Sequence, residues 1–126
     1  MIFCAISAQA QTYWNGTVDK EFAGTGTEAD PYLIETPANL AYLSAQVTAG
    51  ETYAGVYFQQ TEDFDLQSKT WRPIGTTTYK FAGIYNGANK YVSNIKTSQY
   101  GLFGITENTK IVNLSIQGTY SSSNAS

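Results

Sequence analysis

Apolar residues along this chain fall into short runs that are interrupted by Gly, Asn and Thr, a pattern typical of β-strands joined by turns. The predicted strands are residues 32–34, 56–60, 64–66, 81–85, 91–95, 100–105 and 111–116. After residue 10, no run approaches the length of about 20 apolar residues that a transmembrane span requires. The pattern therefore indicates a strand-rich protein without a transmembrane segment.

One segment, residues 36–48, follows a helical pattern instead. Thr36 suits the N-cap and Pro37 suits the first helical position. The apolar residues that recur at spacings of three and four are Leu40, Leu43 and Val47. Gly50 follows and is expected to end the helix.

Two weak internal repeats suggest how the strands are arranged. Residues 92–97 align with residues 111–116, which places Asn94 opposite Asn113, and residues 81–84 align with 102–105. A period of about 20 residues with Gly and Asn at the turns is typical of a β-solenoid. In that fold Asn94 and Asn113 would stack as a ladder, because Asn tolerates the left-handed backbone conformation.

Several motifs occur together in a characteristic order. Gly24-Thr-Gly-Thr27 is followed by Asp30-Pro31-Tyr32-Leu33-Ile34, then by WRPIG at 71–75 and FAGIYNG at 81–87. This order resembles bacterial surface proteins with the GLUG motif and right-handed parallel β-helix repeats, over about residues 22–118. The resemblance implies an all-β right-handed parallel β-helix whose N-terminal end is capped by the helix at 36–48. It also implies export to the cell surface and a role in adhesion or display, without a shared set of catalytic residues.

The two ends of the chain add expectations about its processing and length. Residues 1–10 are apolar and end in Ala8-Gln9-Ala10, the small-x-small pattern of a signal peptidase site. We interpret them as a truncated signal peptide that includes Cys4; the alternative is a short buried strand. Residues 11–126 would then be the N-terminal cap and first coils of a longer β-helix domain. End-to-end association of copies of this chain, through its uncapped C-terminal coil, is a further alternative.

Composition narrows the functional classes. The 126 residues fit one domain, and seven Lys and Arg against ten Asp and Glu give a net charge of -3 without a basic run. Nucleic acid is therefore not an expected partner. There is no His and one Cys, which excludes His-dependent nucleophiles, His-ligated zinc and an internal disulfide. We expect no catalysis, no cofactor and no metal.

Asp63 and Asp65 form the candidate acidic pair. Alternate residues of a strand lie on one face, roughly 6 to 7 Å apart. Such a pair is compatible with a glycosidase acid and base or with part of a calcium site. We favour a solvated strand face, with Phe64 and Leu66 directed to the core.

Trp71, Arg72 and Tyr85 are the candidate carbohydrate contacts, because an indole or phenol ring stacks on sugars and Arg donates to hydroxyls or carboxylates. Packing of Trp71 within the core is the favoured alternative. Together these observations predict a secreted or surface-anchored bacterial β-helix protein, adhesin-like and non-catalytic. A polysaccharide-binding or polysaccharide-cleaving protein is the alternative, and the expected partner is an extracellular glycan or a host surface protein.

Overall fold

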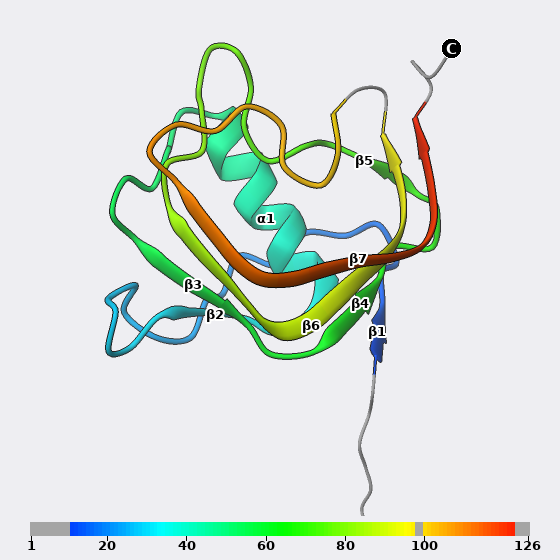
Figure 1. Cartoon of the computed structure of the whole chain (residues 1–126), viewed down its shortest axis with the longest axis horizontal. Helices are drawn as coiled ribbons and strands as arrows, with labels where there is room; N and C mark the ends of the chain where they lie inside the picture. Colours follow the sequence, from blue (N-terminus) through cyan, green and yellow to red (C-terminus); the bar gives the residue numbers. More distant parts are fainter. Residues whose placement is uncertain (1–10, 98–99, 123–126) are drawn as a thin grey trace, which may run out of the picture.

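The computed structural model describes residues 11–97 and 100–122, which form one curled sheet and one helix (Figure 1). The strands are β1 (Gln11–Tyr13), β2 (Tyr32–Ile34), β3 (Tyr57–Gln60), β4 (Asp63–Asp65), β5 (Thr70–Trp71), β6 (Ile84–Thr97) and β7 (Lys110–Ser122), and the helix is α1 (Pro37–Thr48). The sheet order is β1-β4-β6-β3-β2, with β5 and β7 also paired to β6. All of these strand pairs are parallel.

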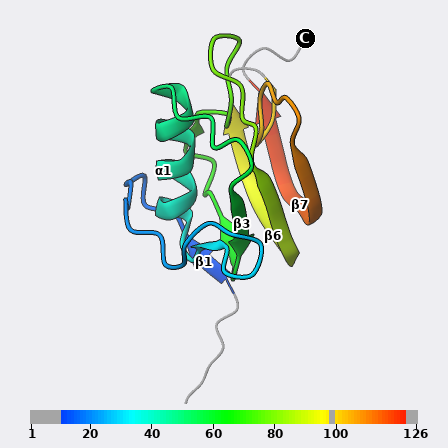
Figure 2. The same ribbon diagram turned by 90° about the vertical axis from the view of Figure 1, so that its left-hand side faces the viewer.

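Strand β6 is the central strand of the curled sheet, because four other strands pair with it. The short strands β3, β4 and β5 pair with successive parts of β6, and β7 pairs along its length. Figure 2 shows α1 and β7 on opposite sides of β3 and β6. The molecule is thus a curled parallel half-barrel with α1 at one end and β7 at the other.

This fold corrects the predicted right-handed parallel β-helix, or β-solenoid. A solenoid coil turns through two or three strands of about four residues each. Here β6 has 14 residues and β7 has 13, each as one bent strand. The segments predicted as separate strands at 81–85 and 91–95 merge, because positive φ angles at Ala88 and Asn89 accompany a bulge instead of a turn. The rest of the core is closed by α1 and by loops.

The register also corrects the predicted repeat. Val92 pairs with Ile116, whereas Ile111 pairs with Tyr85, so the segments 92–97 and 111–116 are not aligned as predicted. Asn94 and Asn113 do adopt left-handed conformations, each with φ of 57°. They do not stack on each other, however, because the register places Asn113 opposite the segment between Asn86 and Lys90, whereas Asn94 lies between Ser93 and Ile95. The Asn94 amide donates to Asp65, and the Asn113 amide lies 3.5 Å from the Asn86 amide oxygen.

The helix agrees with its prediction. The Thr36 hydroxyl caps α1 by accepting the Asn39 N–H at 3.0 Å, and Pro37 occupies the first turn. Gly50, with φ of 119°, follows the C-terminal turn.

The apolar face of α1 is part of the core. Leu40, Leu43 and Val47 are completely buried, and they pack with sheet and loop residues into one core. Within that core the rings of Phe58 and Phe81 lie 6.1 Å apart.

Candidate functional site

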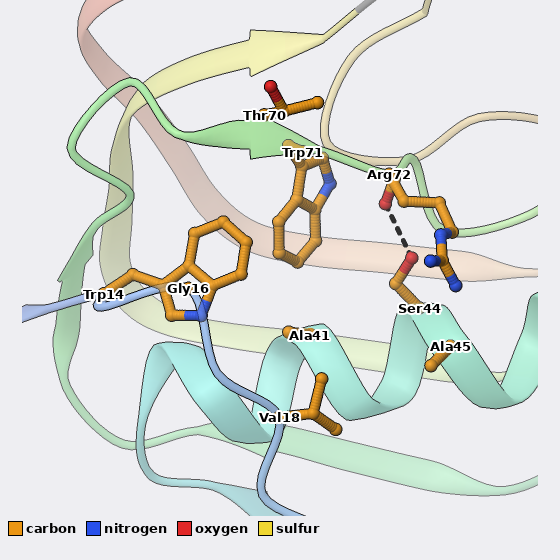
Figure 3. A pocket seen from close by; sticks show the side chains of 9 residues that line it. All are labelled: Trp14, Gly16, Val18, Ala41, Ser44, Ala45, Thr70, Trp71 and Arg72. Carbon is orange, nitrogen blue, oxygen red and sulfur yellow. Dashed lines mark hydrogen bonds between the residues drawn. The ribbon is translucent and has the colours of Figure 1, made fainter.

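Trp71 and Arg72 lie beside a hollow between α1 and β5 (Figure 3), which we call the tryptophan hollow. Its volume is about 220 Å³. The lining comes from the segment after β1 (Trp14, Gly16, Val18), from α1 (Ala41, Ser44, Ala45) and from β5 and the next residue (Thr70, Trp71, Arg72). Six of the nine lining residues are apolar or Gly, and Thr70 and Arg72 are its exposed polar residues.

The two indoles of the tryptophan hollow are fixed by packing and hydrogen bonds. Their ring centres lie 5.4 Å apart at 77°, an edge-to-face contact. Trp14 Nε1 donates to the Thr17 carbonyl at 2.8 Å, and Trp71 Nε1 donates to the Leu102 carbonyl at 3.1 Å. Trp14 is 7% exposed and Trp71 is 2% exposed. Trp71 therefore packs in the core and presents no free ring face on which a sugar could stack.

Arg72 lies at the surface beside these rings. Its carbonyl oxygen accepts a hydrogen bond of 2.6 Å from the Ser44 hydroxyl of α1, drawn in Figure 3, which ties the end of β5 to the helix. Within the described ranges, no carboxylate lies within ion-pair distance of Arg72. The hollow therefore places a cation beside a small apolar surface, an arrangement suited to binding.

Tyr85 does not line the tryptophan hollow. It is completely buried, and its hydroxyl donates to Gln60 Oε1 at 2.7 Å. Gln60 Nε2 in turn donates to the carbonyls of Glu62 and Tyr91. Burial raises the pKa of Tyr85 above its ordinary value. Its predicted carbohydrate contact is thus corrected, because the ring forms part of a buried polar network.

Asp63 and Asp65 lie on β4 and are both half-buried. Asp63 Oδ1 accepts the Tyr91 N–H at 3.0 Å. Asp65 Oδ1 accepts the Gln67 N–H and the Asn94 Nδ2 group, each at 2.8 Å. Both carboxylates therefore help to hold neighbouring segments of the chain in place, a more specific role than the expected solvated face.

A larger hollow, which sequence patterns did not reveal, lies on the outer face of the sheet over β3, β6 and β7. We call it the sheet hollow; its volume is about 460 Å³. Its strand residues are Tyr57 and Gln59 of β3, Ile84 and Asn86 of β6, and Lys110 and Val112 of β7. Glu28, Pro31, Phe58 and Asn113 complete the lining. The alternation of half-buried and buried residues in β3 identifies outward positions, but only the three-strand register brings them together.

Within 11–97 and 100–122, no group of three or more His, Cys, Asp or Glu side chains is arranged as a metal ion would require. Over the same ranges, no helix has the length and hydropathy needed to cross a bilayer; α1 has 12 residues. The predicted signal peptide at 1–10 lies outside the described residues and stays a prediction.

The structure is a small domain, built from one curled parallel sheet and one helix, with two hollows on its surface. No family model and no solved structure matches the chain. Among curated proteins, it is similar to a protein of Evansella cellulosilytica named "Putative Gly-rich membrane protein". The two are 35% identical over 109 residues, which cover 77% of this chain. The chain spans about 12% of the length of that relative.

Proposed function

We propose that this chain is a non-catalytic, adhesin-like contact module at a bacterial cell surface. The observation that carries the proposal is the way the fold uses its polar side chains. Asp63 and Asp65, the predicted acidic pair, accept hydrogen bonds from the chain's own N–H groups. In contrast, neutral polar side chains of β3 and β6 line a hollow that is open to solvent. This division favours binding over acid-base chemistry.

Three further observations support the surface location. The relative in Evansella cellulosilytica bears the name of a membrane protein, and the motif order resembles that of GLUG-motif surface proteins. The small-x-small pattern at Ala8-Gln9-Ala10 is that of an exported chain. We assign the module to the outside of the cell on these grounds.

The location is tested by protease accessibility on intact cells. The full-length protein is expressed in its own organism with an epitope tag inserted after residue 126, next to a tagged cytoplasmic control protein. We expect added protease to remove the tag from intact cells while the control protein survives. A tag that is digested only after lysis would contradict a surface location.

The contact role is tested by adherence of the same cells to mucin-coated glass, since mucin presents both glycans and protein. Cells that lack residues 11–126 should adhere severalfold less than wild-type cells, while the tag after residue 126 still reaches the surface. Unchanged adherence by the deletion strain would contradict the proposed role.

Polysaccharide cleavage is the second candidate, and the half-buried pair Asp63 and Asp65 is the feature that would carry it. We expect the purified chain to release no reducing ends from a panel of polysaccharides. If reducing ends are released, the double variant Asp63→Asn and Asp65→Asn is tested next. Loss of release in that variant, with an unchanged far-UV circular dichroism spectrum, would favour an enzyme over the contact module.

A further inference from the structure

We propose that the sheet hollow binds a neutral, hydroxyl-rich glycan through side chains of β3, β6 and β7. This inference rests on the proposed contact function and goes beyond it by naming the surface and the ligand class. The hollow has a volume of about 460 Å³, within the range of about 300 to 1,000 Å³ that is common for small-molecule sites.

The strand register fixes the side chains of the hollow in two rows. The rows are Tyr57, Ile84 and Lys110, then Gln59, Asn86 and Val112. Neighbouring strands lie about 4.8 Å apart, and residues two apart in a strand are separated by about 6.6 Å. The polar groups therefore sit on a rigid grid, so little conformational entropy is lost when a ligand binds.

The hydrogen-bonding groups in the hollow are largely unused by the fold. Among the described residues, the side chains of Tyr57, Gln59 and Lys110 form no hydrogen bond or ion pair. Asn86 Oδ1 accepts the Ala88 N–H at 2.8 Å, which orients the side chain and leaves its Nδ2 group for a ligand. These groups can bond a ligand without first breaking an internal contact.

The chemistry of these groups selects the ligand class. A side-chain amide donates and accepts, as does a sugar hydroxyl, so Gln59 and Asn86 match a hydroxyl-rich surface. Tyr57 adds a half-exposed ring that offers an apolar face beside a polar hydroxyl. Glu28 and Lys110 carry opposite charges within the hollow, so a neutral ligand fits better than an ion.

A peptide fits the hollow less well than a glycan. Extended peptides bind sheets by pairing with a free strand edge. The floor of the hollow is instead the face of three paired strands, where the main chain of β6 is hydrogen-bonded on both sides, to β3 and to β7. A ligand on this face must be recognised by side chains.

The loop that carries Glu28 and Pro31 is held in place before any ligand arrives. The Asp30 carbonyl accepts hydrogen bonds from three successive N–H groups, those of residues 25–27, at 3.0 to 3.2 Å. The Tyr57 N–H donates to the carbonyl of Gly26 in this loop at 2.9 Å, which joins the loop to β3. This side of the hollow is therefore preformed.

The experiment is binding of the purified full chain to an array of neutral and acidic glycans, followed by calorimetric titration of the neutral glycan that binds best. Gln59→Ala and Tyr57→Ala should each weaken the affinity about tenfold or more, which corresponds to about 1.4 kcal/mol. Gln117→Ala and Tyr79→Ala are the matched controls, because both residues are exposed and lie outside the lining; their affinities should stay within about twofold of wild type.

Three results would overturn the inference: no neutral glycan binds, only acidic glycans bind, or Gln59→Ala binds as well as wild type. Neither Gln59 nor Tyr57 has an internal side-chain hydrogen bond, so both variants should keep the far-UV circular dichroism spectrum of wild type. Protease accessibility and adherence of intact cells are measured separately. Failure of glycan binding in the purified chain is therefore distinguishable from failure of the contact function.

Discussion

At the scale of single residues, the carboxylates of β4 support the neighbouring turns. Asp65 accepts two hydrogen bonds of 2.8 Å, one from the Gln67 N–H and one from the Asn94 amide. Hydrogen bonds to charged groups contribute about 1.5 to 3 kcal/mol each, and they contribute less where solvent competes. Asp65 is half-buried, so each of its hydrogen bonds should contribute less than the same bond in a fully buried site.

We predict that Asp65→Ala lowers the free energy of unfolding by about 2 kcal/mol. Asp65→Asn should lower it by about 1 kcal/mol, because Asn keeps a carbonyl acceptor but loses the charge. Urea-induced unfolding measures both values. Glu28→Ala, at an exposed residue, is the control and should change the free energy of unfolding by less than about 0.5 kcal/mol. An Asp65→Ala variant as stable as this control would contradict the assigned role.

Two buried phenols predict a loss of stability at alkaline pH. Burial raises the pKa of Tyr53 to about 12, and burial of Tyr85 raises its pKa in the same direction. The pKa of an unfolded Tyr is about 10, so the folded state favours the neutral phenol. This stabilisation is complete below pH 10 and is lost as the pH rises from 10 towards 12.

Urea unfolding at several pH values between 8 and 12 tests this behaviour. The free energy of unfolding of wild type should fall above pH 10, and Tyr53→Phe, which cannot ionise at this position, should fall less steeply. Equal slopes for the two proteins would mean that ionisation of Tyr53 is not coupled to unfolding.

At the scale of elements, local signals were sufficient for α1 and insufficient for the sheet. The Thr36 cap, Pro37 and the spacing of the buried helix residues all lie within one stretch of chain, so the predicted segment 36–48 agrees with α1. The extent of β6 and β7 depends instead on pairing between distant residues. Ala88 and Asn89 adopt positive φ and continue a bulged strand, although Asn86-Gly87 and Asn89 are typical of a turn.

In the candidate site, too, local sequence predicts some features, whereas others depend on pairing between distant residues. Trp71 was predicted to favour the core, which the structure confirms, since pairing of Trp71 with Trp14 and Leu102 fixes it there. Sequence alternation could identify Gln59 as an outward residue of its strand. It could not place Gln59 beside Asn86, because that pairing joins two strands that lie far apart in the sequence.

Two hydroxyls at opposite ends of α1 provide a matched stability prediction. Thr36 Oγ1 accepts the Asn39 N–H, whereas Thr48 Oγ1 is buried and has no hydrogen-bond partner among the described residues. Thr36→Ala should lower the free energy of unfolding by about 1 kcal/mol. Thr48→Val, which removes the unpaired hydroxyl and keeps the side-chain shape, should raise it by about 1 kcal/mol. Thermal or urea unfolding should therefore show changes of opposite sign in the free energy of unfolding for the two variants. A destabilised Thr48→Val variant would show that the Thr48 hydroxyl has a hydrogen-bond partner in solution.

At the scale of the whole molecule, the end formed by β7 differs from the end covered by α1. Among the described residues, β7 pairs with β6 on one edge and with no strand on the other. Ile111 and Ile116 are 37% and 48% exposed beside this edge. Unpaired edges with apolar side chains favour association with another strand.

We therefore predict that the chain self-associates through β7, with a second copy as its partner. Analytical ultracentrifugation over a range of concentrations should show a concentration-dependent oligomer. Ile116→Lys should weaken the association, because it places a charge beside the free edge, whereas Tyr79→Lys at an exposed loop position should not. A monomer at all concentrations, or equal association by both variants, would contradict this prediction.

The curled sheet also separates the two hollows, since the tryptophan hollow lies between α1 and β5 while the sheet hollow lies on the outer face of β3, β6 and β7. A single nitrogen-15 correlation spectrum reports on both. The side-chain amides of Gln59 and Asn86 mark the sheet hollow, and the indole N–H groups of Trp14 and Trp71 mark the other. Each group gives its own resolved signals after assignment.

Titration of the labelled full chain with the neutral glycan that binds best on the array is the most direct test of the central claim, that the sheet hollow is the contact surface. We predict that the side-chain amide signals of Gln59 and Asn86 shift as glycan is added, while the indole signals of Trp14 and Trp71 stay in place. Shifts confined to the indole signals, or no shift in any of the four side chains, would contradict the claim.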